Sequence, residues 1–372
     1  MATPKPVFRA DHVGSLLRPE AVKNARKARF ETDTIDPKEL ARVEDDAIRT
    51  AVDMQQAVGL KAVTDGEYRR SFWHYDFLEH LTGFELVARD KGFQFHGASL
   101  RPIYPVISGI LDFPPDHPML EHYSFLASVT QAQPKISIPG PSCCHFRTAL
   151  EDIGPSEYQD QEALFADITR VYAKAVKAFY DVGCRYLQMD DIFFAYLCDP
   201  KIRAEKGSQG VDPDWLVKRY AAMMQGAIKE RPDDMTIAMH LCRGNFQSTW
   251  VADGAYDPVA EAIFTQTGID VFFLEYDSDR AGGLEPLRLL PTGNQRVMAG
   301  FITTKSGDLE TVDELCRKFD MASKYVDLGQ LGIAPQCGFA STEEGNRLSE
   351  DQQKQKLELL VKTAERIWGR VD

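Results

Sequence analysis

A histidine and a cysteine lie two residues apart in the apolar stretch TIAMHLCRGNF, which runs from Thr236 to Phe246. In a β-strand, residues i and i+2 point to the same side, so His240 and Cys242 face together. Imidazole and thiolate groups bind zinc, but both residue types also occur in hydrophobic cores. The pattern alone leaves two interpretations open, core residues or half of a metal site.

Two further residues with metal-binding side chains end predicted strands. Glu275 ends the stretch TGIDVFFLE, and Cys337 ends LGQLGIAPQC. One nitrogen, two sulfurs and a carboxylate suit zinc, which accepts all three ligand types. We therefore predict a zinc site made by His240, Cys242, Glu275 and Cys337, provided that these strand ends meet. A strand-end salt bridge is the alternative for Glu275, and a core position is the alternative for Cys337.

Helical segments alternate with short apolar strands along the chain. The predicted strands lie near residues 8–15, 61–67, 135–141, 186–191, 236–241, 271–275, 296–302 and 331–337. Such alternation favours an α/β fold with a parallel sheet and right-handed crossovers. Eight units predict a (β/α)8 TIM barrel, whose active site lies at the carboxyl ends of the strands. An open doubly wound sheet is the alternative, but no G-x-G-x-x-G motif follows the first strand.

The segment from about residue 84 to 113 interrupts this alternation. It contains aromatic residues, proline and glycine, and it has no helical period. We predict a β-hairpin inserted between two units of the barrel. No change in composition marks a linker, so residues 1–372 are predicted to form a single domain.

The composition excludes several classes of protein. The chain has 372 residues, of which 44% are hydrophobic and 27% charged, and its formal net charge is −13. This acidic balance argues against a nucleic-acid partner. No apolar run approaches the ~18 residues that span a bilayer, and the N-terminus lacks the apolar core of a signal peptide. Seven cysteines, an odd number in a chain of this size, do not indicate a disulfide framework. We expect a soluble, cytoplasmic protein without a membrane partner.

Six stretches resemble motifs of one enzyme family. MHLCRGNF, FFLEYDS and APQCGFAS resemble the three zinc motifs of the cobalamin-independent methionine synthases. HVGSL, DGEYRR and QMDDIFF resemble that family's substrate motifs, and all six follow the family's order between Arg9 and Ile367. The resemblance is to the C-terminal catalytic half, and most closely to short single-barrel relatives. It implies zinc as the cofactor, and a homocysteine-like thiol and a methyl donor as the substrates.

The resemblance also implies which residues hold the thiol substrate. Glu67 and Asp190 would bind its amino group, and Gly14 and Ser15 would bind its carboxylate. Strand-end salt bridges are the alternative for the two acids. Two carboxylates beside a metal favour a substrate with an ammonium group. Neighbouring strand residues face opposite sides, so we expect Asp190 rather than Asp191 to point inward.

Three departures from the family pattern concern the methyl donor. The additional N-terminal barrel of the full-length enzymes has no counterpart here, and Cys144 or His145 stands where they carry a tryptophan. Lys305 lies about where the family has its proposed proton-donating histidine. Lys305 and Asp190 are the candidate catalytic residues, with a solvated loop residue as the alternative for Lys305. His12, which has no assigned counterpart, either touches the substrate or caps its strand.

The favoured function is transfer of a methyl group to homocysteine, giving methionine. A methyl-folate, a smaller donor and a methyl group carried by a partner protein all stay open, as does a homo-oligomer. Arg69, Arg70 and Arg101 are candidate cations for the donor, although surface salt bridges are the favoured interpretation. The rivals are an alkyl transferase or lyase acting on a thiol such as coenzyme M, a metal-free decarboxylase like uroporphyrinogen decarboxylase, and a binding protein with a structural zinc.

Overall fold

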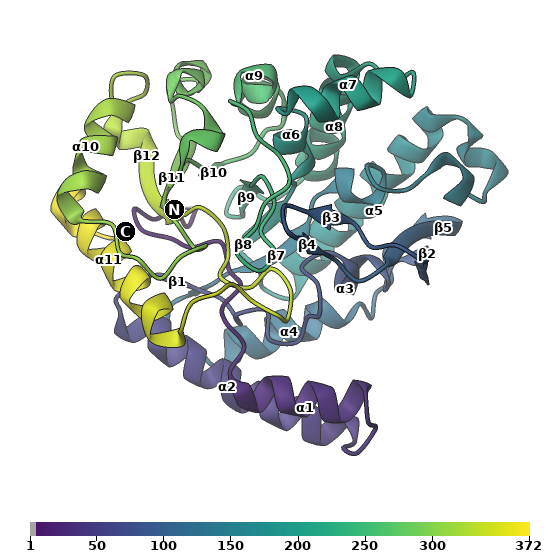
Figure 1. Ribbon diagram of the computed structural model, residues 1–372, viewed down its shortest axis with the longest axis horizontal. Helices are drawn as coiled ribbons and strands as arrows, with labels where there is room; N and C mark the ends of the chain where they lie inside the picture. The colour runs from purple at the N-terminus through teal and green to yellow at the C-terminus, as the bar shows by residue number, and fades with distance from the viewer. Residues whose placement is uncertain (1–4) are drawn as a thin grey trace.

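A parallel sheet surrounded by helices forms the centre of the molecule (Figure 1). The computed structural model describes residues 5–372; residues 1–4 of the predicted domain lie outside the described residues. The strands of the barrel are β1 (Ala62–Val63), β6 (Gln133–Pro134), β7 (Ile136–Pro139), β8 (Tyr186–Asp190), β9 (Thr236–Leu241), β10 (Val271–Glu275), β11 (Arg296–Ile302) and β12 (Leu331–Pro335). The last six pair in parallel in the order β12-β11-β10-β9-β8-β7.

Short contacts on both sides close this sheet into a barrel. β1 pairs in parallel with β6, and the amide of Lys135 donates a hydrogen bond of 2.9 Å to the carbonyl of Val63. On the other side, Ala10 forms a parallel bridge with Ile333 of β12, and the chain just after it hydrogen-bonds to the loop that follows β1. The segment around Ala10 therefore occupies the place of the first strand. The predicted (β/α)8 barrel is confirmed.

The first two barrel strands are shorter than the sequence predicts. Between residues 8 and 15 only Ala10 forms a bridge, and only Ala62–Val63 of the predicted strand 61–67 is extended and paired. Gly14 has a φ of 139° and Glu67 a φ of 61°, so the strand ladder cannot continue through either residue. By contrast, β9, β10 and β11 have the bounds that the apolar pattern predicts.

The helices begin at recognisable caps. The Asp36 side chain accepts hydrogen bonds from two amides of the first turn of α2, where Pro37 is the first residue. Ser349 and Gln352 form a capping box at the start of α11. The α-helices are α1 (Glu20–Phe30), α2 (Pro37–Ala57), α3 (Tyr75–Leu78), α4 (Pro118–Ser128), α5 (Gln161–Asp181), α6 (Phe193–Tyr196), α7 (Pro200–Ser208), α8 (Pro213–Ile228), α9 (Asp257–Gln266), α10 (Val312–Ala322) and α11 (Glu350–Trp368).

An antiparallel hairpin is inserted after α3, as predicted. β2 (Thr82–Ala88) pairs with β5 (Ile103–Asp112), and the smaller pair β3 (Gln94–Phe95) and β4 (Ala98–Ser99) lies between them in the chain. Figure 1 shows β3 and β4 reaching back from β2 and β5 toward the barrel strands. Phe95 packs on Phe246 of the loop after β9, with ring centroids 5.4 Å apart. The insertion therefore covers part of the barrel mouth.

A buried ion pair lies inside the barrel. Lys135 Nζ donates a hydrogen bond of 2.8 Å to Asp11 Oδ1, and the Tyr186 hydroxyl donates one of 2.6 Å to Asp11 Oδ2. These side chains are at most 1% exposed. Burial lowers the pKa of Lys135, whereas the charge of Asp11 raises it. The two opposite charges thus compensate each other inside the barrel.

Polar contacts continue from this pair toward the carboxyl end of β8. Gln188 donates hydrogen bonds of 2.7 Å to the carbonyl of Val13 and to Asp190 Oδ1. Because alternate strand residues share a face, Tyr186, Gln188 and Asp190 all point inward. The row ends at the mouth of the barrel with Asp190.

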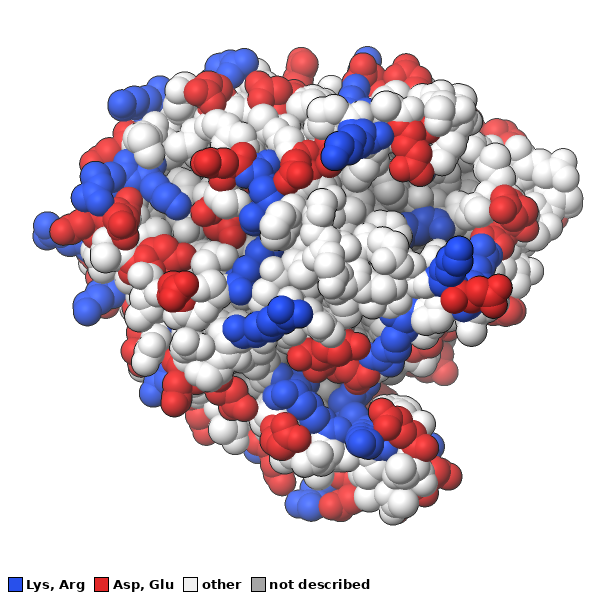
Figure 2. Space-filling view, in the orientation of Figure 1, with Lys and Arg blue, Asp and Glu red and all other residues white. Residues whose placement is uncertain are grey.

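Charges of both signs are mixed around the rim of the face shown in Figure 2, and its centre is mostly uncharged. No helix of residues 5–372 combines the length and the apolar character needed to cross a membrane.

The buried ion pair gives a stability prediction. Lys135→Met leaves the Asp11 carboxylate buried without its cation, which costs about 3–5 kcal/mol. We expect a clear fall in the midpoints of thermal and urea denaturation, followed by circular dichroism. The matched control is Lys174→Met, which breaks an exposed pair with Asp112 and should cost less than about 1 kcal/mol. Equal effects of the two substitutions would contradict a stabilising role for the interior pair.

Candidate functional site

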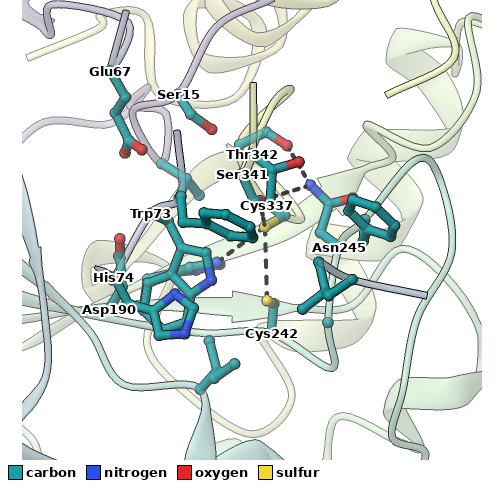
Figure 3. A pocket seen from close by; sticks show the side chains of 18 of the residues that line it. Ser15, Glu67, Trp73, His74, Asp190, Cys242, Asn245, Cys337, Ser341 and Thr342 are labelled. Atoms are coloured by element: carbon teal, nitrogen blue, oxygen red, sulfur yellow. Dashed lines mark hydrogen bonds between the residues drawn. The ribbon is translucent and has the colours of Figure 1, made fainter. Parts of the chain in front are cut away.

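Three of the four predicted zinc ligands come together at the carboxyl ends of β9 and β12. One ligand atom from each of His240, Cys242 and Cys337 lies within 4.8 Å of the others. His240 Nε2 is 3.4 Å from Cys337 Sγ, which is 3.7 Å from Cys242 Sγ. All three side chains are buried, and Figure 3 shows the two sulfurs facing each other. His240 and Cys242, which share one face of the strand, therefore lie beside Cys337, which follows β12 on the other side of the barrel mouth.

The protonation of this group fits a metal ion. The hydrogen bond with Cys337, together with burial, raises the pKa of Cys242 well above its usual value. Burial also raises the pKa of Cys337, but the hydrogen bond from Cys242 and the charge of His240 outweigh it, and the pKa is held well below normal. The buried Nδ1 of His240 has no hydrogen-bond partner. One imidazole and two sulfurs form a donor set that suits zinc.

Glu275 lies outside this three-residue group. Its Oε2 accepts a hydrogen bond of 2.8 Å from the amide of Arg243, and its Oε1 accepts one of 3.1 Å from Arg280. Burial raises the pKa of Glu275, but Lys305 and the two arginines outweigh burial, and the pKa is lowered. The carboxylate raises the pKa of Cys242 and so acts on that thiol through space.

Lys305, the predicted catalytic residue, lies beside Glu275 rather than in the open pocket. Its Nζ is 3.9 Å from Glu275 Oε1 and forms no hydrogen bond with the described residues. The side chain is 9% exposed, so it is not the solvated loop residue that was the alternative. Its positive charge lowers the pKa values of Cys242 and Cys337.

Asp190 lines the same pocket as the three candidate ligands. It ends β8 and lies next to His240 in the strand register. Burial raises the pKa of Asp190 to about 7; the negative charge of Glu67 adds to this, whereas His240 opposes it. Asp191 faces the other side of the sheet, as predicted, and accepts a hydrogen bond from the Ser142 hydroxyl.

Glu67 also lines the pocket, just after β1. Its Oε1 accepts a hydrogen bond of 2.9 Å from the Ser137 hydroxyl, and its Oε2 lies 3.6 Å from Arg70 without a hydrogen bond. Burial raises the pKa of Glu67, although Arg70 opposes this. The structure thus brings the two predicted substrate-binding acids into one pocket.

The residues of the HVGS motif divide between two environments. Ser15 lines the pocket, and a Cβ at Gly14 would lie 3.5 Å from Glu67 Oε1. His12 does not line the pocket; it is buried near Gln55 of α2, and neither ring nitrogen has a hydrogen-bond partner. Burial and the charge of Lys135 lower the pKa of His12 to about 4. The structure therefore does not bring His12 to the other candidate site residues.

Two residues considered in place of the family's tryptophan also lie outside the pocket. Cys144 Sγ is 4.0 Å from the hydroxyl of Tyr172 in α5, and His145 Nδ1 is 2.8 Å from the hydroxyl of Tyr220 in α8. Both side chains therefore pack toward the helical layer.

The three candidate arginines have different environments. Arg101 pairs with Glu343 and Arg69 with Asp45, in the salt bridges that were the favoured interpretation. The interpretation was wrong for Arg70, which is 2% exposed and donates a hydrogen bond of 2.6 Å to the carbonyl of Ser137. Its guanidinium lies behind the pocket and contacts Ser137 and Glu67.

Sequence reasoning missed the aromatic half of the pocket. Trp73 and His74 stack with ring centroids 4.3 Å apart, and Figure 3 shows them on the same side as Asp190. The only signal in the sequence is the run SFWHY directly after the DGE motif. The pocket encloses about 580 Å³ of empty space, open solvent included. The residues that line this half are Phe72, Trp73, His74, Phe95, Leu100, Arg147, Tyr196 and Phe246.

Comparisons with known proteins agree on one family. Residues 8–366 match the family model described as "Cobalamin-independent synthase, Catalytic domain". The chain is 46% identical to "Uncharacterized protein YxjG" of Bacillus subtilis, over 98% of this chain and 96% of that protein. It is 21% identical to a methionine synthase of Sulfurisphaera tokodaii, over 90% of this chain and 86% of that one. A structure from Listeria monocytogenes, described as a "Putative Vitamin-B12 Independent Methionine Synthase", is 36% identical with a TM-score of 0.78, covering 99% of this chain and 100% of that chain.

The three-residue group gives a metal-binding prediction. Cys242→Ser and Cys337→Ser should each weaken zinc binding by more than the roughly 10–100-fold that loss of an outer-sphere partner costs. A competition titration with a chromophoric chelator measures this. Cys198→Ser is the control, because Cys198 is equally buried but its thiol donates to the carbonyl of Phe194. Unchanged affinity in both site variants would exclude these thiols as ligands.

Proposed function

We propose a function from the premise that this chain belongs to the cobalamin-independent methionine synthase family, whose catalytic-domain model it matches over residues 8–366. The resemblance inferred from six motifs is thereby confirmed. Within this methyltransferase family, we propose that the protein is a zinc-dependent enzyme that transfers a methyl group to the sulfur of homocysteine, giving methionine. We also propose that the described residues form one domain.

One observation supports this proposal above all others. The imidazole and the two thiols that suit zinc lie in the same pocket as two buried acids, Glu67 and Asp190. Metal-binding sulfurs and ammonium-binding carboxylates are what a substrate with both a thiol and an amino group requires. A thiol with a sulfonate in place of the amino group, such as coenzyme M, would be repelled by the same acids.

The proposed roles follow from the contacts around each residue. His240, Cys242 and Cys337 would hold zinc, which supplies a lowered pKa for a thiol bound there. Glu275 is the proposed fourth ligand, and in that role its carboxylate would exchange its contacts with Arg280 for the metal. Catalytic zinc sites have three protein ligands and a further position for water or substrate, whereas structural zinc sites have four protein ligands.

The substrate would be held by groups on three different strands. Glu67 and Asp190 would accept hydrogen bonds from its ammonium group, while Ser15, and the backbone at Gly14, would bind its carboxylate. A new sulfur–carbon bond then forms as the bond between the methyl group and the donor breaks, and that bond's electron pair leaves with the donor. The thiol proton is released before this step. Lys305, beside Glu275, would stabilise the negative charge around the sulfurs.

A spectroscopic experiment tests the acceptor assignment. Zinc X-ray absorption should show an additional sulfur neighbour when homocysteine is added to the zinc-loaded protein. Coenzyme M, which lacks an ammonium group, is the matched control and should leave the spectrum unchanged. An unchanged spectrum with homocysteine would contradict the proposal, and a response to coenzyme M alone would favour the alkyl transferase.

The two acids give a prediction about substrate affinity. Glu67→Gln and Asp190→Asn each remove one charged partner of the ammonium group, a contact worth about 1.5–3 kcal/mol. We expect homocysteine to bind roughly 10–100-fold more weakly to each variant by calorimetry. Glu44→Gln is the control: Glu44 is also a buried carboxylate, but it pairs with Arg26 outside the pocket. Equal affinity in all three variants would show that the acids do not bind the substrate.

A further inference from the structure

Arg147 lines the aromatic half of the pocket, and its hydrogen-bonding capacity is largely unused. A guanidinium carries five N–H donors. Here one hydrogen bond goes to the Tyr196 hydroxyl, at the long distance of 3.4 Å, and the buried Nε has no partner. The hydroxyl of Tyr75 also lies close by. Within residues 5–372, no carboxylate forms a salt bridge with Arg147.

Three other arginines around the barrel mouth each have a carboxylate or a carbonyl as a partner. Arg101 pairs with a carboxylate of Glu343, Arg280 pairs with Glu275, and Arg70 donates to the carbonyl of Ser137 and faces Glu67. Arg147 lines the pocket, and no carboxylate of the described residues compensates its charge. An anion brought by a ligand would supply the missing partner.

Aromatic rings hold Arg147 in a fixed place. The guanidinium carbon lies 4.0 Å from the ring centroid of Phe93, in the inserted hairpin, and 5.5 Å from that of Phe193. Stacking on a ring uses the face of the guanidinium and leaves the N–H groups at its edge available. Such a preorganised edge binds a carboxylate, sulfonate or phosphate through paired hydrogen bonds.

His74 offers a second polar contact in the same part of the pocket. It is 2% exposed, stacks on Trp73, and has no hydrogen-bond partner at either ring nitrogen. Burial and the charge of Arg147 lower the pKa of His74 well below its usual value, so its ring is neutral. A neutral imidazole donates one hydrogen bond and accepts another, and therefore adds to an anion site without adding charge.

Arg147 also lies close to where the proposed chemistry occurs. Burial raises the pKa of the Tyr196 hydroxyl; the charge of Arg147 lowers it, and the charges of Cys242 and Cys337 raise it. Tyr196 therefore lies near all three residues. The pocket thus holds two acids, Glu67 and Asp190, together with a cation that has no carboxylate partner among the described residues. Such a set of groups suits two substrates, one with an ammonium group and one with an anionic group.

We propose that Arg147, assisted by His74, recognises an anionic group of the methyl donor, so that the donor is a carboxylate-, sulfonate- or phosphate-bearing compound and not a net cation. This inference rests on the proposed methyltransferase function and names the class of its second substrate. Arg147 is a specificity residue for the donor in this scheme, whereas the acceptor's carboxylate is bound elsewhere, at Ser15.

Calorimetric titration of the zinc-loaded protein, saturated with homocysteine, tests the assignment. The anionic probes are 5-methyltetrahydrofolate and 4-methoxybenzoate, and the cationic probe is trimethylsulfonium, which carries methyl groups but no carboxylate. We expect at least one anionic probe to bind and Arg147→Gln to weaken it roughly 10–100-fold, with Arg147→Lys intermediate because lysine keeps the charge but not the paired donors. Arg89→Gln, which removes an arginine stacked on Tyr104 and paired with Asp152 in the same insertion, should bind as the wild type does.

The possible results separate the donor assignment from the proposed function. Failure of both anionic probes to bind, equal affinity of the wild type and Arg147→Gln, or binding of trimethylsulfonium alone would each overturn the anionic donor. Weaker binding of homocysteine itself to Arg147→Gln would also overturn it, because it would assign Arg147 to the acceptor. A different result would contradict the proposed function alone. In that case homocysteine adds no sulfur neighbour to zinc in the X-ray absorption spectrum, but an anionic probe still binds and its binding still depends on Arg147.

Discussion

Alternate residues of every strand in a closed barrel point into its interior, and each polar group placed there must find a partner. In β8 this constraint produces the inward row of Tyr186, Gln188 and Asp190. Tyr186 is tied to the ion pair between Asp11 and Lys135, and Gln188 is tied to the backbone and to Asp190. The acid at the mouth is therefore held in place by contacts that extend down into the barrel.

The same alternation explains what the sequence could predict about the fold. β9, β10 and β11 were predicted with correct bounds because each is a buried apolar run that stops at a polar residue or a loop. The first strand was overestimated, since its inward residue Asp11 is charged and Gly14 leaves the extended conformation. Partners from distant segments, such as Lys135, decide whether such a strand forms, and a local pattern does not contain them.

The candidate site was predictable to the extent that it sits on strand ends. His240, Cys242 and Cys337 converge because barrel closure brings β9 and β12 to one mouth. The orientation of Glu275 depends on side chains that fold around it from three loops, and sequence spacing does not report these. The sequence did not indicate Arg147 for a similar reason. Loop residues have no periodicity, and only the folded structure shows that no carboxylate pairs with this arginine.

The inserted hairpin has a consequence for how this protein changes over evolutionary time. Phe93 beneath the guanidinium and Phe95 in the pocket wall come from one contiguous segment, joined to the rest of the insertion through the β2–β5 pair. This segment is contiguous in the sequence and separate from β9 and β12, which carry the three candidate metal ligands. A change in its length would therefore alter the packing around Arg147 while the ends of those two strands keep their sequence.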